Sequence, residues 1–419
     1  MPIDNLELAR RIKTAREASG KTQEQVAVVL GVSRPTVTQI ELGNRAVSSI
    51  ELQQLANLFG RDIREFFKEV FVQDDAVAAL FRATPGSEKK GAIESKIKHH
   101  LSVARELASL ESLLEIQHPF GPPPSYELEA PDSRWTAVVQ GRATAEKERS
   151  RLELGSAPIA DLVDLMYSQG IYVGLSKFAD GISGVTLNDH DAGSVVIING
   201  DGHAMARQRF SLAHEFCHVL LDRHSIAMIS NSAEHESIIE VRANAFAAAF
   251  LMPEIGVRRF FRGLGKDMSG SATTDVFSEE KTVSARVRTE SQGQDIQWFE
   301  VLLAAAHFGV SRQAMLFQLK NLKIVSEAER AKLDADLDES RIALFKSMRK
   351  RSVETMDGEV TNNFLIALGV EALRRNIISM AKLEELAALV DNNNYLDQLL
   401  EISGSEVTAK RRKHKGDAR

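Results

Sequence analysis

Residues 207–218 read RQRFSLAHEFCH, a stretch with two histidines and a glutamate at close spacing. His214 and His218 have the spacing H-E-x-x-H, with Glu215 directly after the first histidine. On a helix, positions i and i+4 lie on one face, so both imidazoles can reach one metal ion. Glu215 then lies beside the ion, where it can take a proton from a bound water. The stretch therefore predicts a helix over about 207–223 that carries a catalytic zinc site.

A second predicted helix, over about 236–252, supplies the rest of this site. Two histidines leave a catalytic zinc ion one protein ligand short. Glu240 is the expected third ligand, because small residues beside it let the two helices approach closely. Asn244, one turn further on, is expected to lie behind the ligands. Three other residues are also of a suitable type for the third zinc ligand but lie nearer the polar loop, namely Glu234, His235 and Glu236.

Other residues near the motif have less specific signals. Cys217, the single cysteine, is expected to be a core thiol, and a redox-sensitive neighbour of the metal is the alternative. Ser211 is expected to cap the first helix. Arg207 and Arg209 are expected to pair with carboxylates on the two helices. Four residues are candidates by type for stabilising an oxyanion, namely Tyr172, His203, His224 and His235.

The first 70 residues predict short helices joined by tight turns. Residues 22–25 have the form of a capping box, Gly31 predicts a turn, and Ser33 is expected to cap the next helix. Two short helices with such a turn and a polar second helix are typical of a helix-turn-helix. Gln23 can face a phosphate from the first of these helices. The second helix would expose side chains able to read base edges, namely Arg34, Thr36, Thr38 and Gln39.

Composition limits the class of protein. The chain has 419 residues, 43% of them hydrophobic, and a net charge of −6, which excludes a histone-like polycation. Residues 1–70 hold ten Lys or Arg against nine Asp or Glu, so nonspecific attraction to DNA should be modest. One cysteine excludes a disulfide scaffold. The N-terminus does not have the pattern of a signal peptide, and apolar runs are too short to span a bilayer, so we expect a cytoplasmic protein without a membrane partner.

The order of patterns predicts a mostly α fold with a small β-sheet (α+β). Strands are expected near 171–173, 181–186 and 195–198, and further helices near 143–153 and 158–169. A leucine stripe over 101–114 indicates either a packing helix or a dimerisation arm. We find no internal repeat. The predicted divisions are 1–70 for the helix-turn-helix domain, 71–142 for a helical connector and proline-rich linker, 143–260 for the metal domain, 261–296 for a flexible Ser/Thr-rich excursion, and 297–419 for a helical region with a basic tail.

Residues 5–67 resemble the XRE/lambda-repressor-like helix-turn-helix family. The resemblance is carried by Leu8-Ala9-Arg10-Arg11-Ile12, Thr22 to Ala27, Gly31-Val32-Ser33 and Val37 to Gly43. It implies a five-helix domain that binds double-stranded operator DNA, usually as a homodimer. It also implies that Arg34, Thr36 and Gln39 read bases while Arg10 and Gln23 contact phosphates.

Residues from about 143 to 255 resemble the ImmA/IrrE family of zincin-like metallopeptidases. The segments that carry the resemblance are Arg207 to Glu215, Glu240 to Ala247 and Leu251-Met252-Pro253. It implies Zn²⁺ held by His214, His218 and Glu240, with Glu215 as the general base, as in gluzincins. Cys217 stands where that family commonly has glycine. Such proteins cleave XRE-type repressors and thereby derepress stress-response or mobile-element genes.

The chain is therefore predicted to be a DNA-binding transcriptional regulator fused to a zinc-dependent endopeptidase that cleaves a repressor-type protein. The alternative keeps the same fold but makes the zinc domain a ligand or redox sensor without proteolysis. The presence of Glu215 favours the enzyme, because a sensor has no need of a general base.

Overall fold

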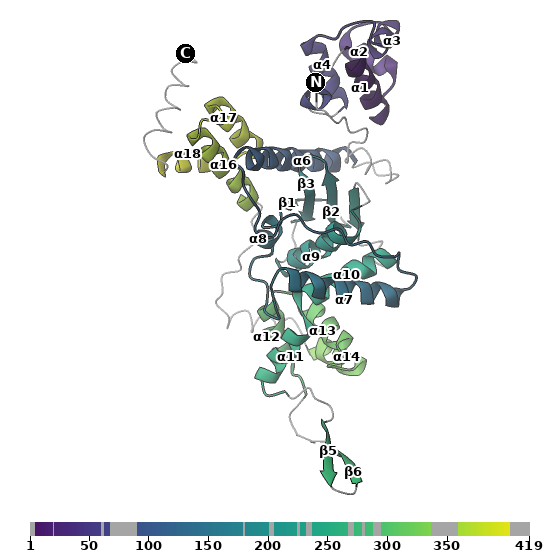
Figure 1. The fold of residues 1–419 in the computed structure, drawn as a ribbon, viewed down its shortest axis with the longest axis vertical. Coiled ribbons are helices and arrows are strands. Elements are labelled where there is room, and N and C mark those ends of the chain that lie inside the picture. The colour runs from purple at the N-terminus through teal and green to yellow at the C-terminus, as the bar shows by residue number, and fades with distance from the viewer. Residues whose placement is uncertain are drawn as a thin grey trace.

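The computed structural model describes residues 5–19, 21–59, 63–67, 90–178, 181–200, 205–223, 227–231, 237–266, 272–278, 281–287, 295–336 and 359–402. Helices make up most of these ranges, together with a four-stranded sheet and a two-stranded hairpin (Figure 1). This composition confirms the expected α+β class.

The N-terminal domain has its own small core. Its elements are α1 (Asn5–Ala18), α2 (Gln23–Leu30), α3 (Arg34–Glu41), α4 (Ser49–Phe59) and the 3-10 helix η1 (Ile63–Phe67). Their buried apolar side chains pack into one cluster around Ile12, Val37, Leu55 and Phe66. The expected sequence of short helices is confirmed.

The turn between α2 and α3 follows its local sequence. The Thr22 hydroxyl and the Gln25 side chain form the predicted capping box at the start of α2. Gly31 ends that helix with φ of 65°, a left-handed conformation that glycine adopts without steric cost. Ser33 precedes α3 in extended conformation, but its hydroxyl pairs with Thr36 Oγ1 at 2.9 Å instead of capping a backbone N–H.

A mixed sheet organises the central region. Its strands are β1 (Tyr172–Ser176), β2 (Ile182–Asp189), β3 (Gly193–Asn199) and β4 (Ala227–Asn231), in the order β1-β3-β2-β4. β1 pairs with β3 in parallel, while β2 is antiparallel to both β3 and β4. Three strands were expected, and β4 was not.

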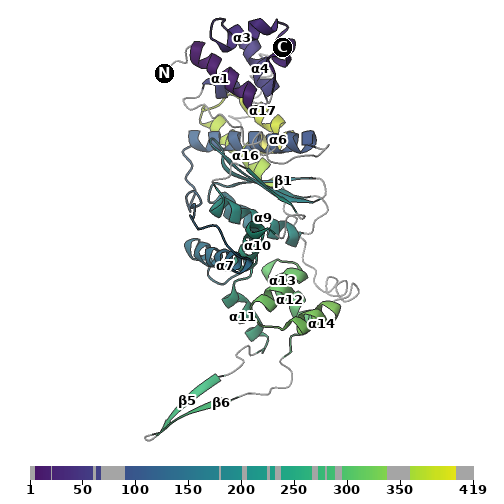
Figure 2. The same cartoon turned by 90° about the vertical axis from the view of Figure 1, so that its right-hand side faces the viewer.

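Helices cover both faces of this sheet (Figure 2). Alternate residues of β3 divide between two cores, with Val196 and Ile198 in one and Val195 and Ile197 in the other. The first core holds α9 (Met205–Leu221), α10 (Ile238–Leu251) and α7 (Arg134–Arg151). The second holds α6 (Lys90–Leu113). The leucine stripe at 101–114 therefore belongs to a packing helix.

Several helix boundaries differ from the expectation. α7 begins at Arg134 and not at 143. α8 (Leu162–Tyr167) begins at Leu162 and not at 158, because Asp161 caps it. α9 begins at Met205, so Ser211 lies inside the helix and the prediction that it forms the cap is wrong. α7 and α10 pack closely at Gly141, where a Cβ would come within 2.4 Å of the Arg242 carbonyl oxygen.

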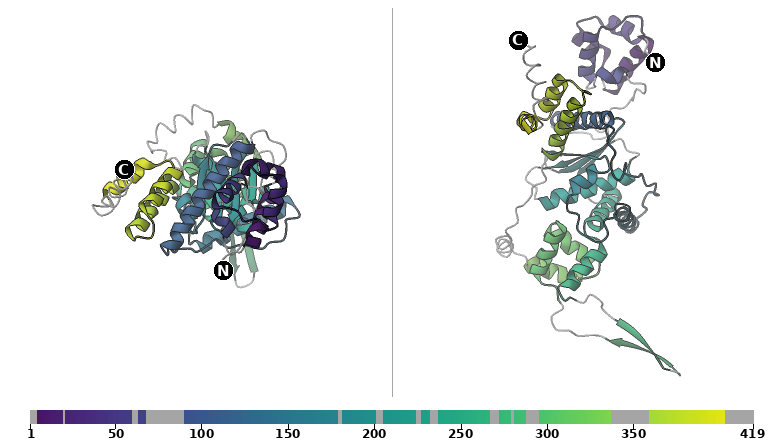
Figure 3. Two further views of the ribbon diagram at one scale, coloured as in Figure 1. Left: turned by 90° about the horizontal axis from the view of Figure 1, so that it is seen from above. Right: turned by 60° about the vertical axis from the view of Figure 1, so that its left-hand side comes forward.

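The C-terminal half adds helices to both cores. The first core continues into α11 (Glu254–Gly263), α12 (Trp298–Phe308), α13 (Arg312–Asn321) and α14 (Glu327–Asp336). The second continues into α16 (Glu359–Arg374), α17 (Met380–Leu389) and α18 (Asn393–Ile402), which lie beside α6 (Figure 3). Within the expected excursion at 261–296, β5 (Ala272–Ser278) and β6 (Lys281–Val287) form an antiparallel hairpin. The expected basic tail lies outside the described residues.

One turn occurs twice in the chain. Residues 31–34 and 309–312 both read Gly-Val-Ser-Arg. The two glycines have φ of 65° and 67°. In each turn the valine N–H bonds back to an alanine carbonyl, Ala27 at 3.0 Å and Ala305 at 2.9 Å. α12 and α13 thus share the local turn of α2 and α3.

Candidate metal centre and nucleic-acid interface

Three predicted side chains meet between α9 and α10. His214 Nε2 lies 3.0 Å from Glu240 Oε2 and 3.3 Å from His218 Nε2. His218 Nε2 lies 3.6 Å from Glu240 Oε1. All three residues are buried, and among the described residues they form the one grouping of such side chains compact enough to hold a metal ion. The rivals Glu234, His235 and Glu236 lie outside the described residues.

The local sequence explains why the two helices present these side chains to each other. One side of α9 buries Leu212, Phe216 and Leu220 in the first core, which turns the histidines toward α10. Ala243 and Ala247 of α10 are fully buried, so the helices approach closely as expected. Ser237 caps α10 by accepting a hydrogen bond from the Glu240 N–H, which places Glu240 in the first turn.

The donor atoms fit a tetrahedral zinc site. With bonds of about 2.0 Å, two ligands of tetrahedral zinc lie about 3.3 Å apart, and the three separations between the donor atoms scatter around that value. Nδ1 of each imidazole faces an oxygen acceptor, Asn244 Oδ1 at 3.1 Å and Asp222 Oδ2 at 2.8 Å. We assign the ring protons to these bonds, which leaves both Nε2 lone pairs directed at one point. In this tautomer, a metal ion at that point could accept both lone pairs.

The electrostatics of the protein without metal point the same way. Burial opposes ionisation of Glu240, but hydrogen bonds from His214 and His218 outweigh it and lower the pKa of this carboxyl to about 2. Burial also disfavours the charged form of His218, but its bonds to Asp222 and Glu240 raise the pKa of this imidazole to about 10. Without a metal ion, a protonated His218 therefore faces the Glu240 carboxylate, and an ion bound between them would take the place of that Nε2 proton.

Asp222 and Arg242 are parts of the site that the sequence analysis missed. Asp222 follows the end of α9, four residues after His218, and Arg242 donates to its other oxygen, Oδ1, at 2.6 Å. Burial raises the pKa of Asp222, but the bonds from His218 and Arg242 outweigh it and lower that pKa overall. A carboxylate that holds a ligating histidine fixes the orientation and tautomer of its ring. The i, i+4 spacing from His218 was the available signal.

Glu215 lies beside the ligands on α9 and faces the sheet. Its side chain is fully buried, and Thr186 of β2 donates to its Oε2 atom at 2.7 Å. Its Oε1 atom has no hydrogen-bond partner among the described residues. Neither feature was anticipated, because the approach of β2 to α9 is a tertiary contact without a local sequence signal.

Several other expectations fail or remain untested. Tyr172 lies on the opposite face of the sheet, in the second core, where its hydroxyl pairs with His100 Nδ1 at 3.0 Å. It is therefore wrong as an oxyanion stabiliser. Arg209 donates to the backbone carbonyls of Ile159 and Ala160 and not to carboxylates of the metal helices. Arg207 is exposed. The remaining candidates, His203, His224 and His235, lie outside the described residues.

Cys217 is fully buried in the first core. Burial raises the pKa of its thiol, against the opposing effect of Arg242. Since reactive thiols are partly exposed and have lowered pKa values, these observations favour the core-thiol interpretation over the redox-sensitive one.

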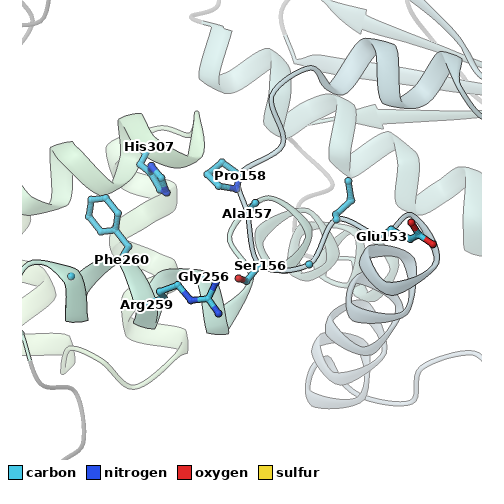
Figure 4. A pocket seen from close by; sticks show the side chains of 11 residues that line it. Glu153, Ser156, Ala157, Pro158, Gly256, Arg259, Phe260 and His307 are labelled. Atoms are coloured by element: carbon cyan, nitrogen blue, oxygen red, sulfur yellow. The ribbon is translucent and has the colours of Figure 1, made fainter.

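A pocket of about 480 Å³ lies elsewhere, between the loop at 153–158 and α11 (Figure 4). Phe260 and His307 form one wall, with their ring centroids 4.9 Å apart, and Pro158 lies on the other side. Its described lining includes neither the three ligands nor Glu215. The pocket and the metal centre are therefore separate features.

The base-reading candidates lie together on α3. Arg34 and Gln39 are exposed, while Thr36 and Thr38 are half-buried. Val37 and Ile40 of the same helix are buried in the domain core, which turns the polar side outward. Asn44 donates to Gln39 Oε1 at 3.0 Å and so steadies that side chain.

The two phosphate-contact candidates are already paired within the domain. Gln23 donates to Glu41 Oε2 at 2.9 Å, and Arg16 holds the same carboxylate. Arg10 forms two bonds of 2.8 Å to Glu7 on the exposed side of α1. Arg10 must therefore leave or share Glu7 to reach a phosphate, which makes its expected contact weaker than the sequence alone indicated.

Comparison with known protein families agrees with both regions. Residues 12–66 match the family described as Helix-turn-helix, and residues 167–320 match the peptidase M78 family described as IrrE N-terminal-like domain. The chain thus joins a DNA-binding helix-turn-helix domain to a metallopeptidase-type domain, as both resemblances predicted. The second family implies a metal, usually zinc, and the His-His-Glu cluster supplies suitable ligands.

Comparisons with whole proteins add less. One solved structure, described as ComR from Streptococcus suis, matches over 96% of this chain and 95% of its own, at 10% identity and a TM-score of 0.16. A search of curated proteins finds no match. Among the helices of the described ranges, none has both the length and the hydropathy to cross a membrane.

Proposed function

We propose that this regulator is a zinc-dependent endopeptidase that cleaves a repressor-type protein, and that it binds operator DNA through its helix-turn-helix domain. The single observation that supports the peptidase best is the geometry of His214, His218 and Glu240, whose donor atoms stand at the separations of a zinc site. Three protein ligands would hold the ion and would leave room for water or substrate, as in catalytic zinc sites.

The residues of the chain divide the chemistry between them. His214, His218 and Glu240 would hold the ion, and Asn244 and Asp222 orient the two imidazoles. When bound, zinc would polarise the scissile carbonyl and lower the pKa of water. Glu215 would accept a proton from the attacking water while the water oxygen forms a bond to the scissile carbonyl carbon. Glu215 then gives the proton to the leaving amine as the peptide bond breaks.

The helix-turn-helix domain that the chain carries supports a proposal about the substrate. We propose a repressor of the same helix-turn-helix type, including a second copy of this chain, and genes of stress response or mobile elements as the regulated set. DNA binding is proposed to occur as a homodimer. With a net charge of only +1 over residues 1–70, specific affinity must come from base contacts and from two domains acting together.

Mixing the purified full-length protein with co-encoded helix-turn-helix repressors tests this function. We expect discrete fragments in the presence of zinc, and no fragments after chelation or with the Glu215→Gln variant. If Glu215→Gln keeps its regulatory effect in cells unchanged and no repressor is cut, the domain is a sensor and not a peptidase.

A further inference from the structure

Strand β2 presents two residues to the metal helix through its alternation. Val185 and Leu187 point into the second core, so Gly184 and Thr186 point to the opposite face, where α9 lies. Both contact the side chain of Glu215. The pairing of β2 with β4 is irregular at this point, with a register shift between Ile182 and Gly184. Such irregularities often mark places where a strand is shaped for a site.

Gly184 is needed for space and not for backbone freedom. A Cβ at this position would lie 2.5 Å from Glu215 Oε1 and 2.7 Å from Glu215 Cδ. These separations are shorter than any van der Waals contact, so alanine at 184 would displace the carboxylate. Its φ is not in the left-handed region, so the backbone itself accepts alanine.

Thr186 makes the two carboxylate oxygens different. Its hydroxyl donates to Oε2 at 2.7 Å, while Oε1 is buried and has no partner in the described part of the chain. A buried carboxylate oxygen without a donor is costly. Sites of this kind are retained where a ligand completes them, and for a general base that ligand is water.

We infer that Gly184 and Thr186 form a slot in β2 that positions Glu215, with Thr186 holding Oε2 and Oε1 left to receive the proton. Both are positioning residues, because they act through Glu215 and do not touch the reacting atoms. This inference rests on the proposed peptidase function for its chemical meaning, although the slot itself can be tested without any substrate.

The first test is a double-mutant cycle on the melting temperature of the zinc-loaded, full-length protein. Gly184→Ala should lower the melting temperature by several degrees, because the added methyl group collides with Glu215. In the Glu215→Ala background the same change should cost little, because the slot is empty. Gly141→Ala is the matched control, since its Cβ would meet the backbone of Arg242 and not Glu215. Its cost should be equal in both backgrounds.

Additive effects of Gly184→Ala and Glu215→Ala would overturn the slot, whatever the activity of the enzyme. Conversely, the two substitutions could be coupled in a protein that cuts no repressor. That result would support the slot but contradict the proposed peptidase function. The two failures are therefore distinguishable.

The second test concerns Thr186. Thr186→Val keeps the shape but removes the donor, and should lower kcat by about tenfold or more with KM and zinc content unchanged. Thr186→Ser should recover most of the loss, because it restores the hydroxyl. A valine variant with kcat within twofold of the wild type, or a serine variant as slow as valine, would contradict the role of this hydrogen bond.

Discussion

The two functional regions of this chain present their polar side chains in opposite ways. On α3 the base-reading candidates Arg34 and Gln39 are exposed, and the domain core lies behind them. In the metal centre every ligand is buried, and both histidines have a partner that fixes the orientation of their rings. A reading surface must give its hydrogen bonds to DNA, whereas a metal site must be preorganised before the ion arrives. Substitutions should therefore change DNA affinity alone in the first region, and both stability and chemistry in the second.

The largest effect should come from Glu215→Gln. This change removes the general base but keeps the side-chain volume, so cleavage should fall by about 10²–10⁴-fold. Zinc content, measured by atomic absorption, and operator affinity should stay at wild-type values. A Glu215→Gln protein that cuts at more than a tenth of the wild-type rate would show that another group activates the water.

Asp222→Asn tests the support behind the ligands. It keeps the shape of the side chain but weakens the bond to the His218 ring, so zinc affinity should fall by about 10–100-fold. Competition with a chromophoric chelator measures this change. Asp164→Asn, at an exposed position of α8, is the control and should leave zinc affinity unchanged. Equal zinc affinities for the Asp222 variant and the wild type would show that Asp222 does not support the metal site.

The repeated turn provides a comparison within the chain for DNA reading. Gln39 of α3 is exposed, and Gln39→Ala should cost about 1–3 kcal/mol of specific operator binding with the melting temperature unchanged. In α13 the residue that corresponds to Gln39 is Phe317, whose side chain is 52% exposed. The residue that corresponds to Thr38 is Leu316, which is buried, whereas Thr38 is half-buried. Phe317→Ala should leave operator affinity unaltered. A fluorescence-anisotropy titration with labelled operator distinguishes the two helices, and equal losses would mean that both read DNA.

The smallest effect concerns an ion pair away from both sites. Arg105 of α6 bonds Asp189 at 2.8 Å, and although burial raises the pKa of Asp189, this bond lowers it overall. Such a pair stabilises the fold above the unfolded pKa of about 4 and loses that contribution as the pH falls below it. Arg105→Met should cost roughly 0.5–1 kcal/mol at pH 7 and less at pH 3. Urea unfolding of the variant and the wild type at the two pH values measures this loss of unfolding free energy. A larger loss at pH 3 than at pH 7 would contradict the prediction.

A site residue could be predicted from the sequence where its position depends on neighbouring residues of the chain, and not where it depends on tertiary packing. His214, His218 and Glu240 could be found because helical spacing fixes which side chains share a face, and that spacing is local. Thr186 and Gly184 could not be found, because which strand lies under α9 depends on the packing of the sheet. Tyr172 was misplaced for a related reason, since a one-residue step along a strand moves a side chain to the other face.

The remaining misses are also tertiary. Arg209 looked like a partner for carboxylates, but in the fold it donates to two carbonyls of the segment before α8. β4 has no alternating apolar pattern of its own and forms because β2 offers it an unpaired edge. In the helix-turn-helix domain, by contrast, caps and turns are encoded within a few residues, so the capping box of α2 and the turn at Gly31 were predicted, although the Ser33 hydroxyl bonds to Thr36 instead of capping α3.

Anomalous diffraction at the zinc edge from crystals of the full-length protein would locate the bound ion itself. We expect one zinc ion per chain, within about 2.0–2.2 Å of Nε2 of His214 and His218 and of a Glu240 oxygen. The fourth position should hold water and no protein atom. An ion bound elsewhere, or a crystal grown with zinc whose Glu240 points away from an unoccupied pair of imidazoles, would contradict this expectation.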